Sequence, residues 1–206
     1  MSSDLKVLQV IPNLGYGGAE TGCYDIAHYL HENNCKSFIV TSGGELIKFV
    51  DKKKVKLIKL PVHSKNPLTI LFNSMALIFI ILFNSIALIF IIFFYDISIV
   101  HARSRAPAWS CLLATKITGR KFVTTFHGTY NFTNSIKKFY NSIMVRSKLV
   151  IAGSNFIFNH INENYQKYRN PKNKLLVIFR GINLEYFNNK NISQKKIKST
   201  DQRMEN

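Results

Sequence analysis

The sequence predicts an α/β fold, a three-layer domain in which helices cover both faces of a mostly parallel sheet. Two observations carry this prediction. Short apolar runs alternate along the chain with longer segments of helical periodicity, and glycine, proline or polar residues separate them. A chain of 206 residues that is 47% hydrophobic can bury a sizeable core. We therefore expect one domain over residues 1–187, followed by a polar, disordered tail at 188–206.

The first unit is a strand, a glycine loop and a helix. Leu5–Ile11 is an apolar run that Pro12 ends, and the glycine-rich segment 15–20 opens a helix that continues to about Asn33. Further strands are expected at Ser37–Thr41, Val55–Leu60, Ile97–His101, Lys121–Phe126, Leu149–Ala152 and Leu175–Phe179. Further helices are expected at Glu45–Lys53, within 67–95, and at Ala106–Thr118, Asn134–Arg146 and Asn155–Tyr165.

The apolar segment 67–95 contains a tandem repeat. Residues 71–81 and 82–92 differ only at Met75 and Ile86, and eleven residues nearly preserve helical phase. Residues 68–95 lack charged side chains and would span about 42 Å as a helix, enough to cross a bilayer. A single span would separate strands that the alternation places in one sheet. Three interpretations stay open: a helix in the membrane interface or against a partner, a true span, and an overgrown core helix.

The formal net charge is +17, and most of the excess lies in the second half of the chain. Residues 101–206 carry nineteen Lys and Arg against four acids. This balance favours polyanionic partners such as lipid headgroups or phosphorylated molecules, although the Lys, Asn, Ile and Phe bias of an AT-rich genome would also produce it. Without the signature of a nucleic-acid-binding fold, we expect no nucleic-acid partner.

Three cysteines without ligand spacing are expected to be reduced and structural, and no metal site is expected. The first residues lack the pattern of a secretory signal. We therefore expect a cytoplasmic protein, with peripheral attachment to the inner face of the cytoplasmic membrane if the apolar helix lies in the interface.

Ligands of parallel α/β sheets bind beyond the carboxyl ends of the strands. Here those ends carry Gly15–Glu20, His101–Arg105, His127–Tyr130, Ser154-Asn155 and Arg180–Asn183. The chain has no carboxylate pair, metal-ligand cluster or G-x-S-x-G elbow, so hydrolase and metalloenzyme functions lack residues to carry them.

The glycine loop fails the dinucleotide-binding pattern, because Glu20 stands where G-x-G-x-x-G needs its third glycine. Gly17 and Gly18 would still let a ligand approach a helix N-terminus; alternatively the loop is only a tight turn, with Glu20 favouring the helix dipole. Arg103 and Arg105 suit a phosphate or carboxylate, or are solvated surface residues. His127 is either a site residue or a structural one.

Five segments in this order resemble the N-terminal half of a family 4 glycosyltransferase of the GT-B type. They are VLQVIPNLGYGGAE, IVHARSRAPAW, FVTTFHGTYNF, LVIAGSNF and LLVIFRGINLEYF, and the resemblance covers about residues 5–187. The resemblance implies a Rossmann-like, acceptor-binding domain that faces a second, donor-binding domain. It also implies sugar transfer from a nucleotide-sugar co-substrate with retention of anomeric configuration, and no further cofactor.

The resemblance also implies roles for individual residues. His127, the catalytic candidate, would contact the donor sugar near the reacting carbon. The segment Arg180–Asn183 resembles a hinge to the second domain, and Asn183 stands where Asp is frequent. The glycines would face the donor diphosphate, and the arginines would line the acceptor side. The predicted binding residues are Gly17, Gly18, Glu20, Arg103, Ser104, Arg105, Gly128, Ser154, Arg180 and Asn183.

After Phe187 the sequence has no Glu-x7-Glu motif and no room for a donor domain. We therefore expect little transfer by this chain alone, which would be a truncated product or would need a separate donor-domain chain. The acceptor would be a glycan or lipid-linked molecule of the cell envelope. Two alternatives stay open: a non-catalytic remnant that binds a membrane or partner, and a nicotinamide-cofactor binder, which Glu20 disfavours.

Overall fold

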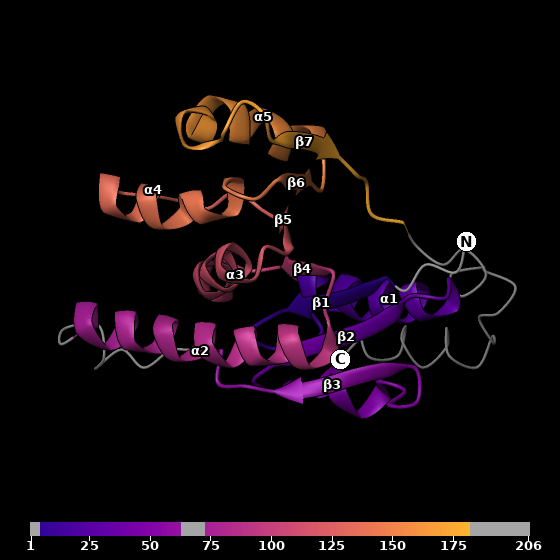
Figure 1. The fold of residues 1–206 in the computed structure, drawn as a ribbon. Helices are drawn as coiled ribbons and strands as arrows, with labels where there is room; N and C mark the ends of the chain where they lie inside the picture. Colours follow the sequence, from indigo (N-terminus) through magenta and orange to yellow (C-terminus); the bar gives the residue numbers. More distant parts are fainter. Residues whose placement is uncertain (1–4, 63–72, 182–206) are drawn as a thin grey trace, which may run out of the picture.

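The structure, a computed structural model, describes residues 5–62 and 73–181, and these form an α/β domain (Figure 1). The expected tail at 188–206, the start of the apolar segment at 67–72 and the candidate residue Asn183 lie outside the described residues.

The sheet has seven parallel strands in the order β3-β2-β1-β4-β5-β6-β7. The strands are β1 (Lys6–Val10), β2 (Lys36–Thr41), β3 (Val55–Lys59), β4 (Ile99–Ala102), β5 (Lys121–Phe126), β6 (Leu149–Ala152) and β7 (Lys174–Val177). All seven expected strands are present. The order reverses between β1 and β4, which is the position at which open α/β sheets bind ligands.

Helices cover the two faces unequally (Figure 1). The α-helices are α1 (Gly18–Glu32), α2 (Asn73–Tyr95), α3 (Arg105–Thr118), α4 (Ser135–Asn141) and α5 (Asn155–Tyr165). The larger core packs α2, α3 and α5 against one face, around Leu8, Val100 and Val150. The smaller core packs α1 against the other face, around Ile39 and Cys23. Right-handed crossovers place a helix on opposite faces according to the direction in which the chain moves along the sheet, which accounts for this division.

Two expected helices are shorter than the sequence suggested. The segment expected at 45–53 is a 3-10 helix, η1 (Glu45–Phe49), which follows Gly44 in a positive-φ conformation. The segment expected at 134–146 divides into α4 and the 3-10 helix η3 (Ser142–Val145). All four residues of η3 are buried, so the tighter turn lets consecutive side chains enter the core. A last 3-10 turn, η4 (Gln166–Tyr168), follows α5.

Helix α2 packs on α3 and the sheet, but about half of its described apolar side chains are exposed. Leu88 and Ile92 are fully buried, whereas Phe90 is 70% and Phe94 is 81% exposed. Within the described residues, Ile78–Tyr95 is one helical stretch long and apolar enough to cross a membrane by length and composition. Strands β3 and β4, which precede and follow α2 in the sequence, belong to the same sheet. This confirms the expectation that the strands on both sides of the apolar segment form one sheet.

Candidate functional site

The candidate site forms where the alternation of two neighbouring strands directs polar side chains to the face that carries α1. Along β4, Val100 and Ala102 enter the larger core, so His101 and the following Arg103 point to the opposite face. Along β5, the same alternation places Thr125 and the following His127 on that face. The sequence pattern therefore gathers two histidines and an arginine at one end of the sheet.

Arg103 is a buried cation held by backbone and side-chain acceptors. Its side chain is 3% exposed, its Nε donates to the carbonyl of Ala19 at 3.3 Å, and its Nη1 donates to Gln9 Oε1 at 3.3 Å. Gln9 in turn donates to the carbonyl of Cys23 at 3.0 Å. Burial lowers the pKa of Arg103, with a further contribution from the charge of Arg180. These bonds orient a fixed positive charge beneath the first turn of α1.

Arg180 approaches the same turn from the segment after β7. Its Nη2 donates to Thr21 Oγ1 at 3.2 Å, and a Cβ added at Gly18 would lie 2.5 Å from its Nη1. A Cβ added at Gly22 would lie 2.9 Å from Nη2 of Arg103. Glycine at these positions therefore lets two guanidinium groups approach the N-terminal part of α1, where backbone N–H groups add to the positive potential.

His127 stands beside these cations and stays neutral. Burial lowers its pKa to about 3, and the charges of Arg103 and Arg180 contribute to the shift. Its Nε2 is buried without a hydrogen-bond partner among the described residues. His101 lies deeper and is satisfied, with Nε2 2.7 Å from Thr125 Oγ1; burial also lowers its pKa well below the ordinary range. A neutral imidazole with a free nitrogen can exchange a hydrogen bond with a ligand hydroxyl.

Two clefts meet at Arg103 and His127, the only residues in the described parts of the chain that line both. The first cleft, of about 420 Å³, lies between the glycine loop and the ends of β4 and β5. Its polar lining comprises Asn13, Glu20, Arg103, Ser104, Arg105, His127, Tyr130 and Tyr140. The second cleft, of about 510 Å³, lies over the exposed sheet face beside α1. Its lining includes Asp25, Tyr29, His101, Thr125 and Arg180.

Glu20 and Arg105 both line the first cleft. Glu20 belongs to the first turn of α1, and its carboxylate lies where a Cβ on Gly17 would be, so the glycine turn is already occupied by a negative group. Arg105 donates to Asn141 Oδ1 at 2.7 Å, and its guanidinium lies 4.3 Å from the ring centroid of Tyr130. Held by these two partners, Arg105 presents a fixed cation to a ligand in the first cleft.

Three other predicted binding residues, Ser104, Ser154 and Gly128, have local structural positions. Ser104 and Ser154 are the N-cap residues of α3 and α5, and Ser154 Oγ accepts from the N–H of Ile157 at 3.2 Å. Gly128 follows His127, and a Cβ added there would meet nothing within 4 Å. Sequence reasoning missed Gln9, Thr21 and Tyr140. A glutamine inside the apolar run of β1 was a usable signal for Gln9, whereas no local pattern marks Thr21.

The described residues contain no group of three or more His, Cys, Asp or Glu side chains that could hold a metal ion. The groups at the two clefts that can act on a ligand are the guanidinium groups of Arg103, Arg105 and Arg180, the imidazole of His127 and the N-terminus of α1. This combination suits a ligand that carries both phosphate and hydroxyl groups.

Comparisons with known proteins identify the family and the fold. The sequence model of Glycosyltransferase Family 4 matches residues 16–186. A glycosyltransferase from Rickettsia africae has a similar structure, with 42% identity and a TM-score of 0.76 over 98% of this chain and 50% of that one. HepE from Anabaena, solved with UDP and glucose, has 15% identity and a TM-score of 0.66 over 97% of this chain and 50% of that one.

Sucrose-phosphate synthase from Thermosynechococcus elongatus has 12% identity and a TM-score of 0.67, over 88% of this chain and 49% of that one. At such low identity, this protein and HepE show the shared fold alone. The chain spans about half the length of these three solved structures. No curated protein matches the sequence significantly.

Proposed function

The chain belongs to Glycosyltransferase Family 4, and from this premise we propose that it forms the acceptor-side part of an enzyme that transfers a sugar from a nucleotide-sugar to a glycan or lipid-linked acceptor. The observation that carries the proposal is the position of His127. Its unpartnered nitrogen lies where two clefts meet, next to Arg103 and Arg180. A transfer reaction needs this arrangement, because donor and acceptor must meet at one point.

The cations would neutralise the negative charge that grows on the departing diphosphate. Arg180 lines the second cleft and, with the N-terminus of α1, would face the donor phosphates. Because Glu20 occupies the glycine turn, a diphosphate would lie toward Arg180 rather than directly on Gly17. Such fixed charges act without reorganisation in a site from which water is excluded.

His127 would hydrogen-bond a hydroxyl of the donor sugar near the reacting carbon. Since its pKa is lowered to about 3, it would do so as a neutral group throughout the physiological range. The first cleft, with Arg105 and Tyr140, would hold the acceptor. Bringing the acceptor hydroxyl to the sugar is a positioning contribution, to which the fixed ends of β4 and β5 are suited.

We further propose that transfer retains the anomeric configuration, that the nucleotide-sugar is the only small-molecule co-substrate, and that the donor-binding groups come from a second domain. These proposals rest on the family membership and on the half-length match to the R. africae enzyme. Proton NMR of the product sugar tests the stereochemistry, because an inverted product would exclude retention.

The central experiment pairs the chain with a donor-side half from a similar protein. The full chain is co-expressed with the second half of the R. africae glycosyltransferase, and release of UDP from UDP-glucose and other UDP-sugars is measured. We expect His127→Ala to reduce turnover about tenfold or more. The matched control is His160→Ala, because His160 also has a buried, unpartnered Nε2 but lines neither cleft. Unchanged turnover in His127→Ala would remove this residue from the site.

The exposed apolar side chains of α2 favour a second candidate function, a non-catalytic domain that binds a membrane or partner. An assembly that folds and binds UDP but transfers no sugar from any tested donor would favour this candidate. The two functions are therefore separated by turnover rather than by binding.

A further inference from the structure

Helix α2 has polar side chains on its buried face and apolar side chains on its exposed face, the reverse of an amphipathic helix in a water-soluble protein. Its polar side chains Asn84 and Ser85 are buried, whereas its exposed side chains are large and apolar. Asn84 Nδ2 donates to the carbonyl of Pro61 at 3.3 Å, and Ser85 Oγ donates to the carbonyl of Ile81 at 2.6 Å. The α2 stripe, as we define it, consists of Ile78, Phe79, Leu82, Phe83, Ile86, Phe90, Phe93 and Phe94, which are 47–81% exposed.

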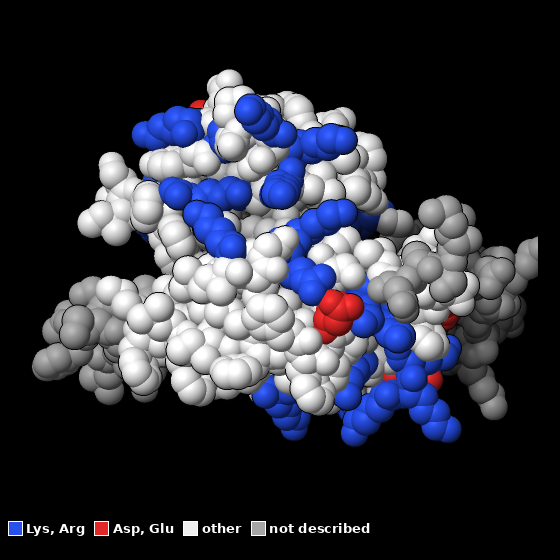
Figure 2. Space-filling view, in the orientation of Figure 1, with Lys and Arg blue, Asp and Glu red and all other residues white. Residues whose placement is uncertain are grey.

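The α2 stripe is continuous along the helix. Its members recur at spacings of three and four residues, so they share one face, and from Ile78 to Phe94 they extend about 24 Å. Single exposed apolar residues are ordinary on protein surfaces, but a contiguous stripe with five phenylalanines is not. The surface over α2 forms an uncharged band in Figure 2, with Lys and Arg side chains on both sides of it.

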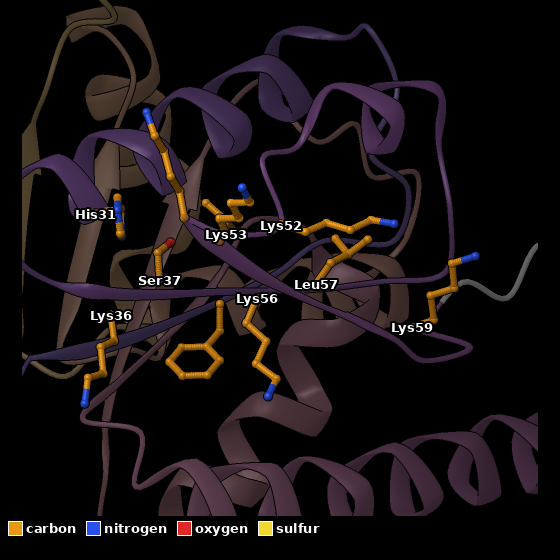
Figure 3. Close-up of a pocket in the computed structure, with 11 residues that line it drawn as sticks. His31, Lys36, Ser37, Lys52, Lys53, Lys56, Leu57 and Lys59 are labelled. Carbon is orange, nitrogen blue, oxygen red and sulfur yellow. The ribbon is translucent and has the colours of Figure 1, made fainter.

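Basic side chains gather around the C-terminal end of α2. Lys56 Nζ lies 4.5 Å from the ring centroid of Tyr95, the last residue of the helix. The following residue, Asp96, accepts from Lys6 Nζ at 3.1 Å and from Arg120 Nη2 at 2.7 Å. Lys36 pairs in register with Lys6, and Figure 3 shows Lys36 and Lys56 pointing from the sheet to the side on which α2 lies. These four residues, Lys6, Lys36, Lys56 and Arg120, are the basic rim.

We propose that the α2 stripe and the basic rim dock the protein on the surface of an anionic phospholipid bilayer. The phenylalanine rings enter the boundary between headgroups and acyl chains, and the rim binds lipid phosphates. Interfacial helices combine apolar burial with attraction to anionic lipids in this way. The inference goes beyond the proposed sugar transfer and does not depend on it.

The geometry favours this occupant over a transmembrane position. Leu88 and Ile92 are fully buried in the core, and Ser110 of α3 donates to the carbonyl of Ile81 at 3.1 Å. Moving α2 into a bilayer would expose that core and break these bonds, while β3 and β4 must stay in one sheet. A bilayer surface covers the α2 stripe without moving the helix.

Charge also favours lipid over a second copy of the chain. In the basic rim, Lys6 and Arg120 share the carboxylate of Asp96 and Lys56 lies against Tyr95, and the whole chain carries a net charge of +17. Two such surfaces placed face to face would repel each other, whereas phosphatidylglycerol supplies the opposite charge.

The test is flotation of the full chain with vesicles of equal parts phosphatidylglycerol and phosphatidylcholine, and with vesicles of phosphatidylcholine alone. We expect the protein to float with the anionic vesicles and to partition at least tenfold more weakly into the neutral ones. The double variant Phe90→Ser/Phe94→Ser should lose about tenfold or more in partitioning. The matched control is Ile136→Ser/Phe156→Ser, because these side chains are 80% and 70% exposed on α4 and α5. Circular dichroism confirms that both variants fold.

A second variant tests the charge. Lys56→Gln should weaken binding to anionic vesicles several-fold, and Lys172→Gln, in the turn before β7, should not. The proposal is overturned by no flotation with either vesicle, or by equal flotation of the Phe90→Ser/Phe94→Ser and control variants. It is also overturned by resistance to alkaline extraction, which indicates a span, or by a dimer that Phe90→Ser/Phe94→Ser abolishes.

Discussion

Arg180 and Thr21 lie 159 positions apart in the sequence, yet Nη2 of the arginine donates a hydrogen bond to Oγ1 of the threonine at 3.2 Å. The contact joins the segment after the last strand to the first turn of α1. It brings a second guanidinium to the place where Arg103 is already buried. Two like charges lie together at a helix N-terminus, an arrangement that a bound anion stabilises.

The first prediction follows from this arrangement. Arg180→Ala should weaken binding of UDP about tenfold, because one of the two cations that face the diphosphate is lost, while stability changes by less than about 1 kcal/mol, as an exposed contact is removed. Isothermal titration calorimetry on the co-expressed assembly measures the affinity. Arg120→Ala, at the opposite end of the sheet, is the control. Equal affinities for the two variants would place the diphosphate elsewhere.

Two glycines of α1 should respond differently to alanine. A Cβ on Gly22 would lie 2.9 Å from Arg103, which is buried and hydrogen-bonded and cannot move away, so we expect overpacking to cost about 1–2 kcal/mol despite the better helix propensity of alanine. A Cβ on Gly18 would meet only the end of the Arg180 side chain, which can move. Gly18→Ala should therefore leave stability unchanged or raise it by up to about 1 kcal/mol. Urea unfolding measures both, and a Gly18→Ala that is less stable than Gly22→Ala would contradict the argument.

Two histidines of the candidate site make stability depend on pH. The pKa of His127 is lowered to about 3 and that of His101 is lowered well below 6.5, mainly by burial. Below pH 6.5 the unfolded chain takes up protons that the folded chain does not, so stability is fully present above that pH and is lost as pH falls toward 3. Between pH 7 and pH 5 we expect a loss of about 1–2 kcal/mol for each histidine.

Urea unfolding at pH 5, 6 and 7 checks this dependence. His127→Asn should flatten the curve, because one of the histidines whose pKa is lowered by burial no longer titrates. The control is His31→Asn, which alters a histidine in the last turn of α1, outside the two clefts. A curve with the same slope in His127→Asn and in the unaltered chain would show that the pKa of His127 is the same in the folded and unfolded states.

The sequence predicted the parts of the fold that depend on local pattern. Each of the seven strands coincides with an apolar run in the sequence. The alternation of side chains along β4 and β5 also places Arg103 and His127 on the same face of the sheet. The contact of Arg180 with Thr21 joins residues 159 positions apart and has no local signal. The orientation of α2 was also open, because its apolar residues surround the helix and only packing against α3 decides which face is buried.

Gly44 fixes the glycine loop, and this gives the last prediction. Its φ is +131°, and an added Cβ would collide with the backbone of Leu14, which cannot move as the end of a side chain could. The two segments are bonded there, with Leu14 N–H donating to Gly43 O at 2.7 Å and Leu46 N–H donating to Leu14 O at 2.9 Å. We expect Gly44→Ala to cost about 2–4 kcal/mol from backbone strain and displacement of the loop.

Gly43→Ala is the matched control, since a Cβ there meets nothing within 4 Å, and it should change stability by less than about 0.5 kcal/mol. Thermal unfolding of Gly44→Ala and Gly43→Ala is the measurement. If the turn tolerated no side chain at either position, both variants would lower the unfolding midpoint equally, and the close backbone approach at Gly44 would not be the cause.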